Sequence, residues 1–372
     1  MAFGFRKKRS AGRRRRPAPF KARVDDFWRW FAAHERRLFN ELQDGSLDPA
    51  ELGAKVDAVT PVLAWEMCPS PEEGREGFTV SAEGSPSVRL LVEALLDAAP
   101  PLEHWTLFGS KQPGEGMRSM RVGDRGEFAF ADFRFAVDFD AESERLSIQV
   151  HHPRFSELGP EIRSQLTFLA LEQALGEDLI DAWVGPVEDT PERTPDQKYG
   201  VQELRRQVRA ALELNDLDPD LDLSTQWTGY SLPEQGDGDL EARADVLTGT
   251  SRTMGPIRGL FDADFDDELA GTGACFAYAM LPVDDLESGR EVEQRAELED
   301  RLGEALREDR VGDCFGGALG QQYVYVDLVL FDEAAAIERL RVALADSGIA
   351  TRASLRFFAS ERRDEHIALL VD

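Results

Sequence analysis

The C-terminal part of the chain carries the pattern that most restricts its fold, because strand-like and helix-like segments alternate there in a definite order. The strand-like segments, rich in aromatic and branched residues, are 273–281, 314–318, 323–331 and 355–358. Between them lie two segments with apolar residues at helical spacing, 291–307 and 333–347. Asp332 can cap the second helix, and Gly348 can end it. We therefore predict the order β-α-β-β-α-β over about residues 272–372.

This order is that of a ferredoxin-like split βαβ sandwich, in which an antiparallel sheet buries one face under two helices. The chain has 372 residues, a length that suggests two domains. We expect the α+β fold class, with antiparallel sheets packed by helices in both domains.

The preceding region also contains strand patterns. Residues 131–139 alternate apolar and polar side chains, which is the period of a strand with one buried face. A polar turn and a second alternating run, 146–150, predict a β-hairpin. The same alternation places His151 on the wet face and His152 on the buried face. After a helix that ends near a glycine, residues 178–185 are predicted to return as a strand.

We expect four consecutive parts in the chain. Residues 1–23 form a basic, flexible arm, and residues 24–187 form an α+β domain. Residues 188–200 (EDTPERTPDQKYG) are polar and contain proline without any apolar period, so they are predicted to be a linker. Residues 201–372 form the C-terminal domain.

Charge is distributed unevenly between these parts. The whole chain has a formal net charge of −28, yet residues 1–23 contain ten basic residues and no acidic one. The rest of the chain therefore carries a net charge of −38. Because binding to phosphates requires positive charge, this acidic body is unsuited to nucleic acid or anionic membrane. Either partner would have to bind through the arm.

The arm has a run of four arginines, Arg13, Arg14, Arg15 and Arg16. The simplest interpretation is a solvated arm. The alternatives are an anion-binding arm, for RNA or a lipid headgroup, and a contact with the acidic body of the same chain. No apolar stretch follows the arginines, so a secretory signal is not expected.

The cysteines and apolar runs bear on location. Cys68, Cys275 and Cys314 form no CxxC pair, so neither a zinc knuckle nor a disulfide framework is predicted. No apolar run approaches the roughly 20 residues of a membrane span. Reduced thiols in the cytoplasm are the simplest interpretation.

No motif assigns a reaction. Asp216, Asp218, Asp220 and Asp222 resemble the start of a calcium loop, but Leu221 and Trp227 occupy the positions that require glycine and glutamate. The five histidines show no metal-ligand spacing. We therefore predict no metal and no cofactor, and catalytic residues stay unknown.

Five segments resemble an uncharacterised bacterial family of cytoplasmic α+β proteins. They are FWRWFAAHERRLFN (27–40), GFTVSAEG (77–84), LLVEALLDAAPPLEHWTLFGSKQP (90–113), FLALEQALGEDLIDAWVGPVED (168–189) and ARADVLTGTSR (242–252). The resemblance implies no established activity and no functional residues. The C-terminal segment is similar, in its acidity and element order, to the regulator of ribonuclease activity B type of domain. That second resemblance implies a small acidic domain that acts by binding a ribonuclease.

These observations favour a cytoplasmic, non-catalytic interaction or regulatory protein whose acidic surface binds a protein partner. One alternative is an enzyme with an unrecognised site in a cleft between the domains. Another is a binding protein that resembles the ribonuclease regulators. The oligomeric state is not predicted.

Overall fold

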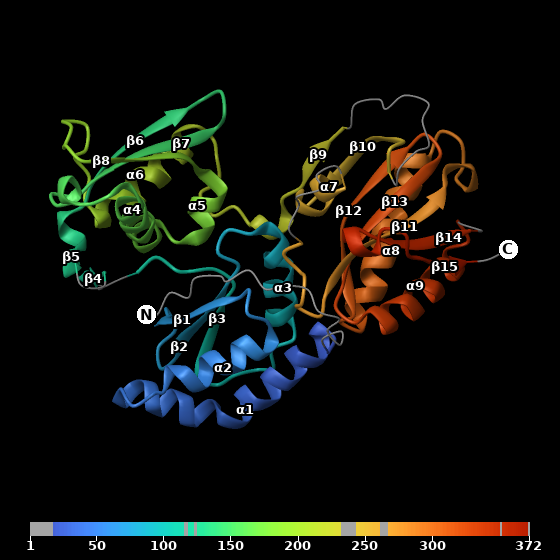
Figure 1. Cartoon of the computed structure of the whole chain (residues 1–372), viewed down its shortest axis with the longest axis horizontal. Helices are drawn as coiled ribbons and strands as arrows, with labels where there is room; N and C mark the ends of the chain where they lie inside the picture. Colours follow the sequence, from blue (N-terminus) through green and yellow to red (C-terminus); the bar gives the residue numbers. More distant parts are fainter. Residues whose placement is uncertain are drawn as a thin grey trace. The chain divides into compact units, whose positions relative to one another are not determined.

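The computed structural model describes residues 18–114, 118–122, 125–231, 243–260, 267–349 and 352–370. It contains helices and β-sheets in both halves of the chain, which confirms the α+β class (Figure 1). The chain divides into two compact units. The described residues of unit 1 are 18–26, 243–248 and those from 256 onward, and unit 2 holds 27–231 and 249–255.

The sheet of unit 1 has the strand order β15-β14-β11-β13-β12, and every one of these neighbours pairs antiparallel. Its strands are β11 (Cys275–Pro282), β12 (Gly312–Gly320), β13 (Tyr323–Leu330), β14 (Ala353–Phe357) and β15 (His366–Leu370). Beyond β12 the order continues with β10 (Val246–Ser251) and β9 (Thr228–Tyr230). The five strands from β15 to β12 form the part of the sheet that packs with helices.

Helices α8 (Glu291–Glu308) and α9 (Glu333–Ser347) bury their apolar sides in one core with alternate residues of these strands. Leu298 and Leu302 of α8 are fully buried in it, as is Val326 of β13. The predicted cap and stop of α9 are confirmed: Asp332 accepts a hydrogen bond from the backbone of Ala335, and Gly348 is left-handed. The core therefore lies on one side of the sheet.

Helix α1 (Phe20–Asp44) starts in unit 1. The backbone N–H of Phe20 donates to the carbonyl of Gly273 at 3.2 Å, and that of Lys21 donates to Phe331 at 3.1 Å. The rings of Phe20 and Phe331 are 5.6 Å apart. These contacts fix the first turn of α1 against the start of β11 and the end of β13.

Unit 2 contains a mixed sheet, β1-β2-β3, with helices α1, α2 and α3. The bounds are α2 Pro49–Val59, β1 Ala64–Pro69, β2 Glu76–Ser81, α3 Pro86–Asp97 and β3 Trp105–Phe108. Phe27 and Phe31 of α1 pack against Phe78 of β2, with ring centroids 6.2 and 5.3 Å apart. Aromatic side chains of α1 thus form part of the core that packs on this sheet.

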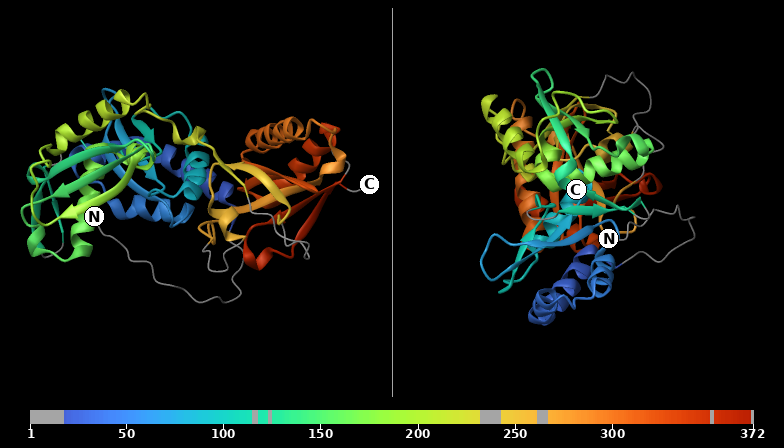
Figure 2. Two further views of the ribbon diagram at one scale, coloured as in Figure 1. Left: turned by 90° about the horizontal axis from the view of Figure 1, so that it is seen from above. Right: turned by 90° about the vertical axis from the view of Figure 1, so that its left-hand side faces the viewer.

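A second sheet of unit 2, β6-β7-β8, packs with helices α4, α5 and α6. Its elements are β6 Arg134–Asp140, β7 Arg145–His151, α4 Pro160–Leu175, α5 Glu177–Trp183, β8 Val184–Thr190 and α6 Val201–Leu214. The predicted hairpin is confirmed as the antiparallel pair β6 and β7, drawn in green at the left of the first view in Figure 2.

Residues 188–200 lie within unit 2. The end of β8 pairs in parallel with β7, and Tyr199 exchanges backbone hydrogen bonds of 2.9 and 3.1 Å with Phe135. The strand predicted over 178–185 is wrong, because α5 occupies most of it. Gly176, with φ +80°, ends α4, and acidic residues in the next turn favour a new helix start.

The remaining elements are short. The strand pair β4-β5 (Ser119–Arg121 and Glu127–Ala129) and helix α7 (Gly255–Gly259) complete the helices and strands of the described residues. The 3₁₀ turns are η2 Phe130–Asp132, η3 Phe155–Glu157, η4 Leu223–Thr225, η5 Val283–Asp285 and η6 Ser360–Arg362.

Candidate functional site

The histidines are placed separately and serve packing roles. The ring of His34 stacks on that of Trp30. The Nδ1 of His34 lies 2.7 Å from the backbone carbonyl oxygen of Trp30. His104 packs on Phe39, with centroids 4.8 Å apart. His366 is exposed on β15. These three do not form a shared site.

The adjacent pair at the end of β7 corrects one expectation. His151 is buried rather than on the wet face, and its Nδ1 lies 3.1 Å from the carbonyl oxygen of Thr190 on β8. Strand β8 lies beside β7 in the same sheet, and the ring of Phe155 packs near that of His151, with centroids 6.4 Å apart. His152 is buried as predicted, among Phe133 and its neighbours, and burial lowers the pKa of its imidazole.

The arginine run of the arm, Arg13–Arg16, lies outside the described residues. Of the other basic residues assigned to the arm, Lys21 and Arg23 belong to helix α1. Lys21 Nζ pairs with Asp25 at 2.7 Å, and Arg23 Nε donates to the carbonyl of Ala18 at 3.1 Å. These two cations are therefore engaged within unit 1.

The acidic loop after α6 is held by short-range contacts. Asp220 pairs with Arg209 through two hydrogen bonds of 2.7 and 2.6 Å, and Asp222 accepts from the backbone of Ser224 at 2.9 Å. Within the described ranges, no group of three or more His, Cys, Asp or Glu side chains is arranged to hold a metal ion. No helix among those residues is long and apolar enough to cross a membrane.

A dense polar junction in unit 2 centres on Glu177, at the start of α5. Its buried carboxylate accepts hydrogen bonds from the hydroxyl of Ser81 (2.6 Å) and the backbone N–H groups of Gly84 (3.1 Å) and Lys111 (2.9 Å). The Lys111 ammonium lies 3.2 Å from Glu172. The junction thereby joins three of the segments that carry the first resemblance, 77–84, 90–113 and 168–189.

Arg89 completes this junction from α3. It pairs with Asp178 at 2.9 Å and with Asp181 at 2.8 Å. Burial nevertheless raises the pKa of Asp181 to about 6. Because every charged group here already makes hydrogen bonds or ion pairs within unit 2, the junction is suited to holding the two sheets of unit 2 together rather than to binding a ligand.

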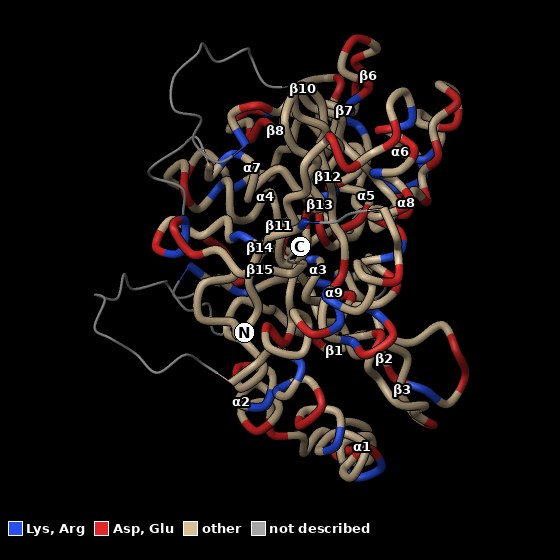
Figure 3. Tube along the Cα trace, turned by 90° about the vertical axis from the view of Figure 1, so that its right-hand side faces the viewer, with Lys and Arg blue, Asp and Glu red and all other residues tan. Residues whose placement is uncertain are grey.

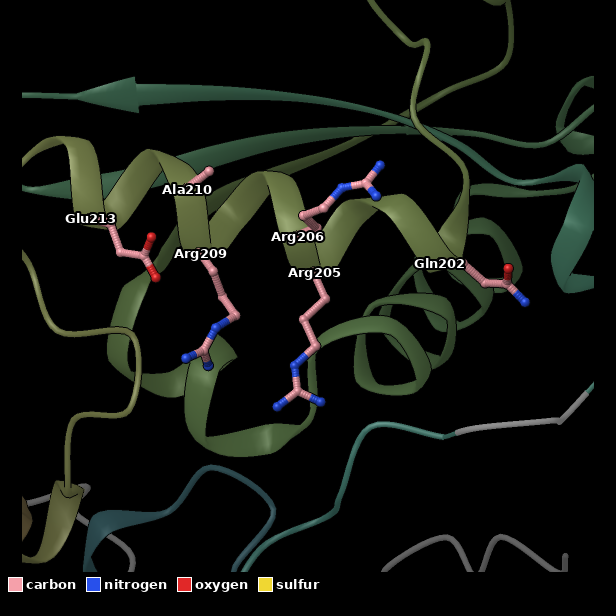
Figure 4. Close-up of a pocket in the computed structure, with 6 residues that line it drawn as sticks. All are labelled: Gln202, Arg205, Arg206, Arg209, Ala210 and Glu213. Carbon is pink, nitrogen blue, oxygen red and sulfur yellow. The ribbon is translucent and has the colours of Figure 1, made fainter.

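Three arginines gather on the outer side of α6. Arg205 and Arg209 point to one side of the helix and Arg206 to the other, around an open hollow of about 420 Å³ (Figure 4). The hydrogen bonds with Asp220 raise the pKa of Arg209. All residues that line the hollow come from this one helix, so it offers a surface for an anion but no enclosing walls.

The exposed residues of α8 include five acids along one side, together with the basic Arg301 and Arg307. The exposed acids at successive spacings of four, three, four and four residues are Glu293, Glu297, Asp300, Glu304 and Glu308. This spacing places them on one side of the helix over about 22 Å. We call this set the α8 acidic stripe. Figure 3 shows acidic and basic residues interspersed over the described part of the chain.

Among the described residues, basic side chains neutralise only one end of the stripe. Arg290 lies 3.1 Å from Glu293 and 3.5 Å from Glu297. In the part of the chain that the structure describes, no basic side chain forms an ion pair with the other three acids, Asp300, Glu304 and Glu308. Such unpaired carboxylates attract a cationic partner with little desolvation penalty.

The other face of the unit 1 sheet holds a buried ion pair. Asp327 of β13 is fully buried, and its neighbours Val326 and Leu328 belong to the core under α8 and α9. Asp327 therefore projects from the opposite face. Both of its oxygens accept hydrogen bonds from the guanidinium of Arg243, which is also buried. Burial raises the pKa of Asp327, against the effect of Arg243.

The carboxylate of Asp245 also ties the segment that contains Arg243 to the sheet. Asp245 accepts hydrogen bonds from the hydroxyl of Tyr325 and from the backbone N–H groups of Gln322 (2.9 Å) and Tyr323 (3.1 Å). A Cβ at Gly320 would lie 2.3 Å from this carboxylate, so the turn between β12 and β13 requires glycine there. Residues 243–245 are thus tied to the sheet at two points.

Comparisons of the chain with protein-family models, curated proteins and solved structures found no match. Both resemblances given above therefore stay expectations. Sequence patterns predicted the helix that carries the α8 acidic stripe, and the spacing of its acids was readable. The buried ion pair of Arg243 and Asp327 could not be predicted from the sequence, because the two residues are 84 positions apart and neither belongs to a motif.

Proposed function

We propose that the protein is a non-catalytic interaction protein with a regulatory role, whose α8 acidic stripe binds a basic segment of a protein partner. The observation that carries this proposal is the row of exposed carboxylates on α8, of which Asp300, Glu304 and Glu308 form no ion pair with a described residue. The helix is anchored through Leu298, Leu302 and the rest of its apolar side, so the stripe is a fixed row of charge.

A fixed row of this kind selects partners by the spacing of their cations. Exposed ion pairs contribute about 0.2–1 kcal/mol each, so several must form together for specific binding. A basic helix or extended segment that spans about 22 Å can meet all five acids. Complementary charge also accelerates encounter at low ionic strength.

The test uses the full chain and a synthetic peptide of alternating arginine and alanine, with affinity measured by fluorescence anisotropy at low and high salt. The stripe variant combines Asp300→Asn, Glu304→Gln and Glu308→Gln. It should weaken binding about tenfold, which corresponds to roughly 1.4 kcal/mol. High salt should reduce the affinity of the unaltered chain towards that of the stripe variant.

The matched control removes the same three charges elsewhere, by Glu73→Gln, Glu192→Gln and Asp196→Asn, all exposed residues of unit 2. It should bind the peptide within about twofold of the unaltered chain, since it keeps every stripe carboxylate. Equal weakening in both variants would mean that total charge rather than the stripe attracts the peptide, and the proposal would fail.

We also propose a ferredoxin-like sandwich for about residues 272–372. The strand order β14-β11-β13-β12, with α8 and α9 packed on one face, supports this assignment. For location we propose the cytoplasm, supported by three cysteines that form no disulfide, Cys68, Cys275 and Cys314. An acidic sandwich that binds a ribonuclease is one form that the partner proposal could take.

A further inference from the structure

The guanidinium of Arg243 is enclosed by aromatic rings as well as by Asp327. Its Cζ lies 4.7 Å from the ring centre of Tyr325, 5.2 Å from that of Tyr278 and 5.4 Å from that of Phe358. All three rings are at most 5% exposed. We call Asp327 and these three rings the cation cage.

The cage is built by the sheet itself. Tyr278 of β11 lies directly opposite Asp327 of β13 in the antiparallel register. Tyr325 precedes Asp327 by two positions on the same face, and Phe358 directly follows β14 and packs on Tyr278 with centroids 5.0 Å apart. Four rigid positions on three neighbouring strands therefore surround one cation.

This set of groups selects a guanidinium over an ammonium. The two oxygens of Asp327 accept two N–H groups side by side, which the planar fork of arginine supplies and a lysine ammonium does not. A flat guanidinium also stacks on aromatic rings. A lysine in the cage would leave one carboxylate oxygen buried without its donor.

The present occupant does not fit without strain. Arg243 has φ +70°, a left-handed conformation that is unfavourable for a residue with a Cβ. In addition, buried ion pairs contribute little net stability compared with apolar residues of similar volume. An arginine presented on an extended backbone would make the same fork and ring contacts without this strain.

We propose that the cation cage is a binding site for an arginine side chain of a protein partner, and that Arg243 is its internal occupant. The partner's arginine displaces Arg243 and takes over its contacts with Asp327 and the three rings. This site lies on the face of the sheet opposite α8, so it is independent of the α8 acidic stripe. Arg243 lowers the apparent affinity for the partner's arginine. That apparent affinity equals the intrinsic affinity multiplied by the fraction of molecules in which the cage is vacant.

The first test vacates the cage with Arg243→Ala and uses N-acetyl-arginine methylamide as the probe, with binding measured by calorimetry. The variant should bind this compound at least tenfold more tightly than the unaltered chain does. It should also prefer it at least tenfold over the lysine analogue. Adding Asp327→Asn to the variant should abolish this preference. A folded Arg243→Ala chain that binds both compounds equally, or neither, would overturn the proposal.

A second variant separates occupancy from stability. Arg243→Met fills the cage with an apolar side chain of similar length, and such replacements of buried ion pairs are commonly tolerated when both partners are neutral. We therefore pair it with Asp327→Asn and expect a folded chain that does not bind the arginine compound. Arginine-selective binding by this filled cage would show that the compound binds elsewhere, which contradicts the proposal.

The unaltered chain provides a readout if Arg243→Ala does not fold. Displacement of residues 243–245 releases the backbone amides of Gln322 and Tyr323, which Asp245 holds. An arginine-bearing peptide should therefore accelerate hydrogen exchange at these amides, and its lysine counterpart should not. Unchanged exchange under saturating arginine peptide would overturn the proposal. If that peptide binds and the stripe variant weakens it, the proposed function survives this outcome.

Discussion

Glu299 is the residue at which burial and ionisation conflict most clearly in unit 1. It lies on α8 outside the acidic stripe, and only 14% of its side chain is exposed. Burial raises the pKa of its carboxyl group to about 7, with Arg295 opposing the shift and Asp327 on β13 adding to it. Arg295 Nε lies 3.1 Å from Glu299 Oε1, but neither of these two atoms makes a hydrogen bond. Cys314 on β12 is the neighbouring thiol, and the Glu299 charge helps to raise its pKa.

The raised pKa of Glu299 predicts a definite pH dependence. Folding favours the protonated carboxyl, so its contribution to stability is complete below its ordinary pKa and is lost as pH rises through about 7. We expect Glu299→Gln to flatten the fall in the free energy of unfolding between pH 5 and 8, by up to about 3 kcal/mol. Urea denaturation at several pH values measures this.

A second carboxyl group with a raised pKa, that of Asp181 in unit 2, provides a reference for this pH dependence. Asp181, with a pKa of about 6, contributes a fall of the same sign, so the Glu299→Gln chain should retain part of the slope. A variant with the same slope as the unaltered chain would show that Glu299 does not titrate in this range.

Single residues also mark what sequence could and could not predict. The alternation around His152 correctly placed it in the core, because its own strand determines which face it occupies. His151 was misplaced, since its partners, Thr190 on β8 and Phe155, lie outside the hairpin from which the alternation was read. The contact of Arg243 with Asp327 in the cation cage was likewise not predictable, because it joins residues far apart in the sequence and belongs to no periodic pattern.

At the scale of elements, the start of α1 depends on a glycine in another segment. Gly273 has φ +86°, and a Cβ there would lie 2.3 Å from the carbonyl oxygen of Ala18. This close approach lets Phe20 donate its backbone hydrogen bond to Gly273. The first turn of α1 and the entry to β11 therefore form one packed feature.

Gly273→Ala should separate these two segments. We expect a loss of about 3 kcal/mol or more, from the left-handed backbone and the overlap together. Gly271→Ala is the matched control, because Gly271 has φ +84° with nothing within 4 Å of an added Cβ, and it should cost only about 1–2 kcal/mol. Thermal or urea unfolding compares the two, and equal losses would contradict a close approach at Gly273.

Element patterns were most reliable where a segment was long and its ends were marked. The helix with Asp332 at its start and Gly348 at its end was predicted correctly for this reason. Six of the seven residues of α5 were predicted as a strand, because two turns are too short for helical and strand periods to differ. The role that we propose for α8 rests on the side opposite its apolar residues, and that side can be identified from the sequence.

At the scale of the whole molecule, the basic arm and the acidic body can be tested separately. Deleting residues 2–17 removes eight of the ten basic groups and no described contact. We expect the thermal midpoint to stay unchanged after this deletion. Deleting residues 2–23 also removes Phe20, which is 1% exposed, and should cost about 3–5 kcal/mol. Calorimetry on both truncated chains makes this comparison.

The shorter deletion also tests the arm as an anion-binding segment. If Arg13–Arg16 bind RNA or anionic lipid, the full chain should bind either with strong salt dependence, and the chain without residues 2–17 should not. Binding that survives this deletion would place the anion site on the body. The hollow beside Arg205 and Arg206 on α6 would then be the first surface to alter.

The contact between Lys21 and Phe331 joins positions that are more than 300 residues apart in the sequence, so the ribosome makes them at well-separated times. Unit 2 is complete once residue 255 has emerged, so it can fold while the rest is still being made. Unit 1 cannot, because its first turn of α1 must wait for β11 and β13. For that interval helix α1 lacks the segments that pack on its first turn, and a nascent chain is the place where chaperones would meet it.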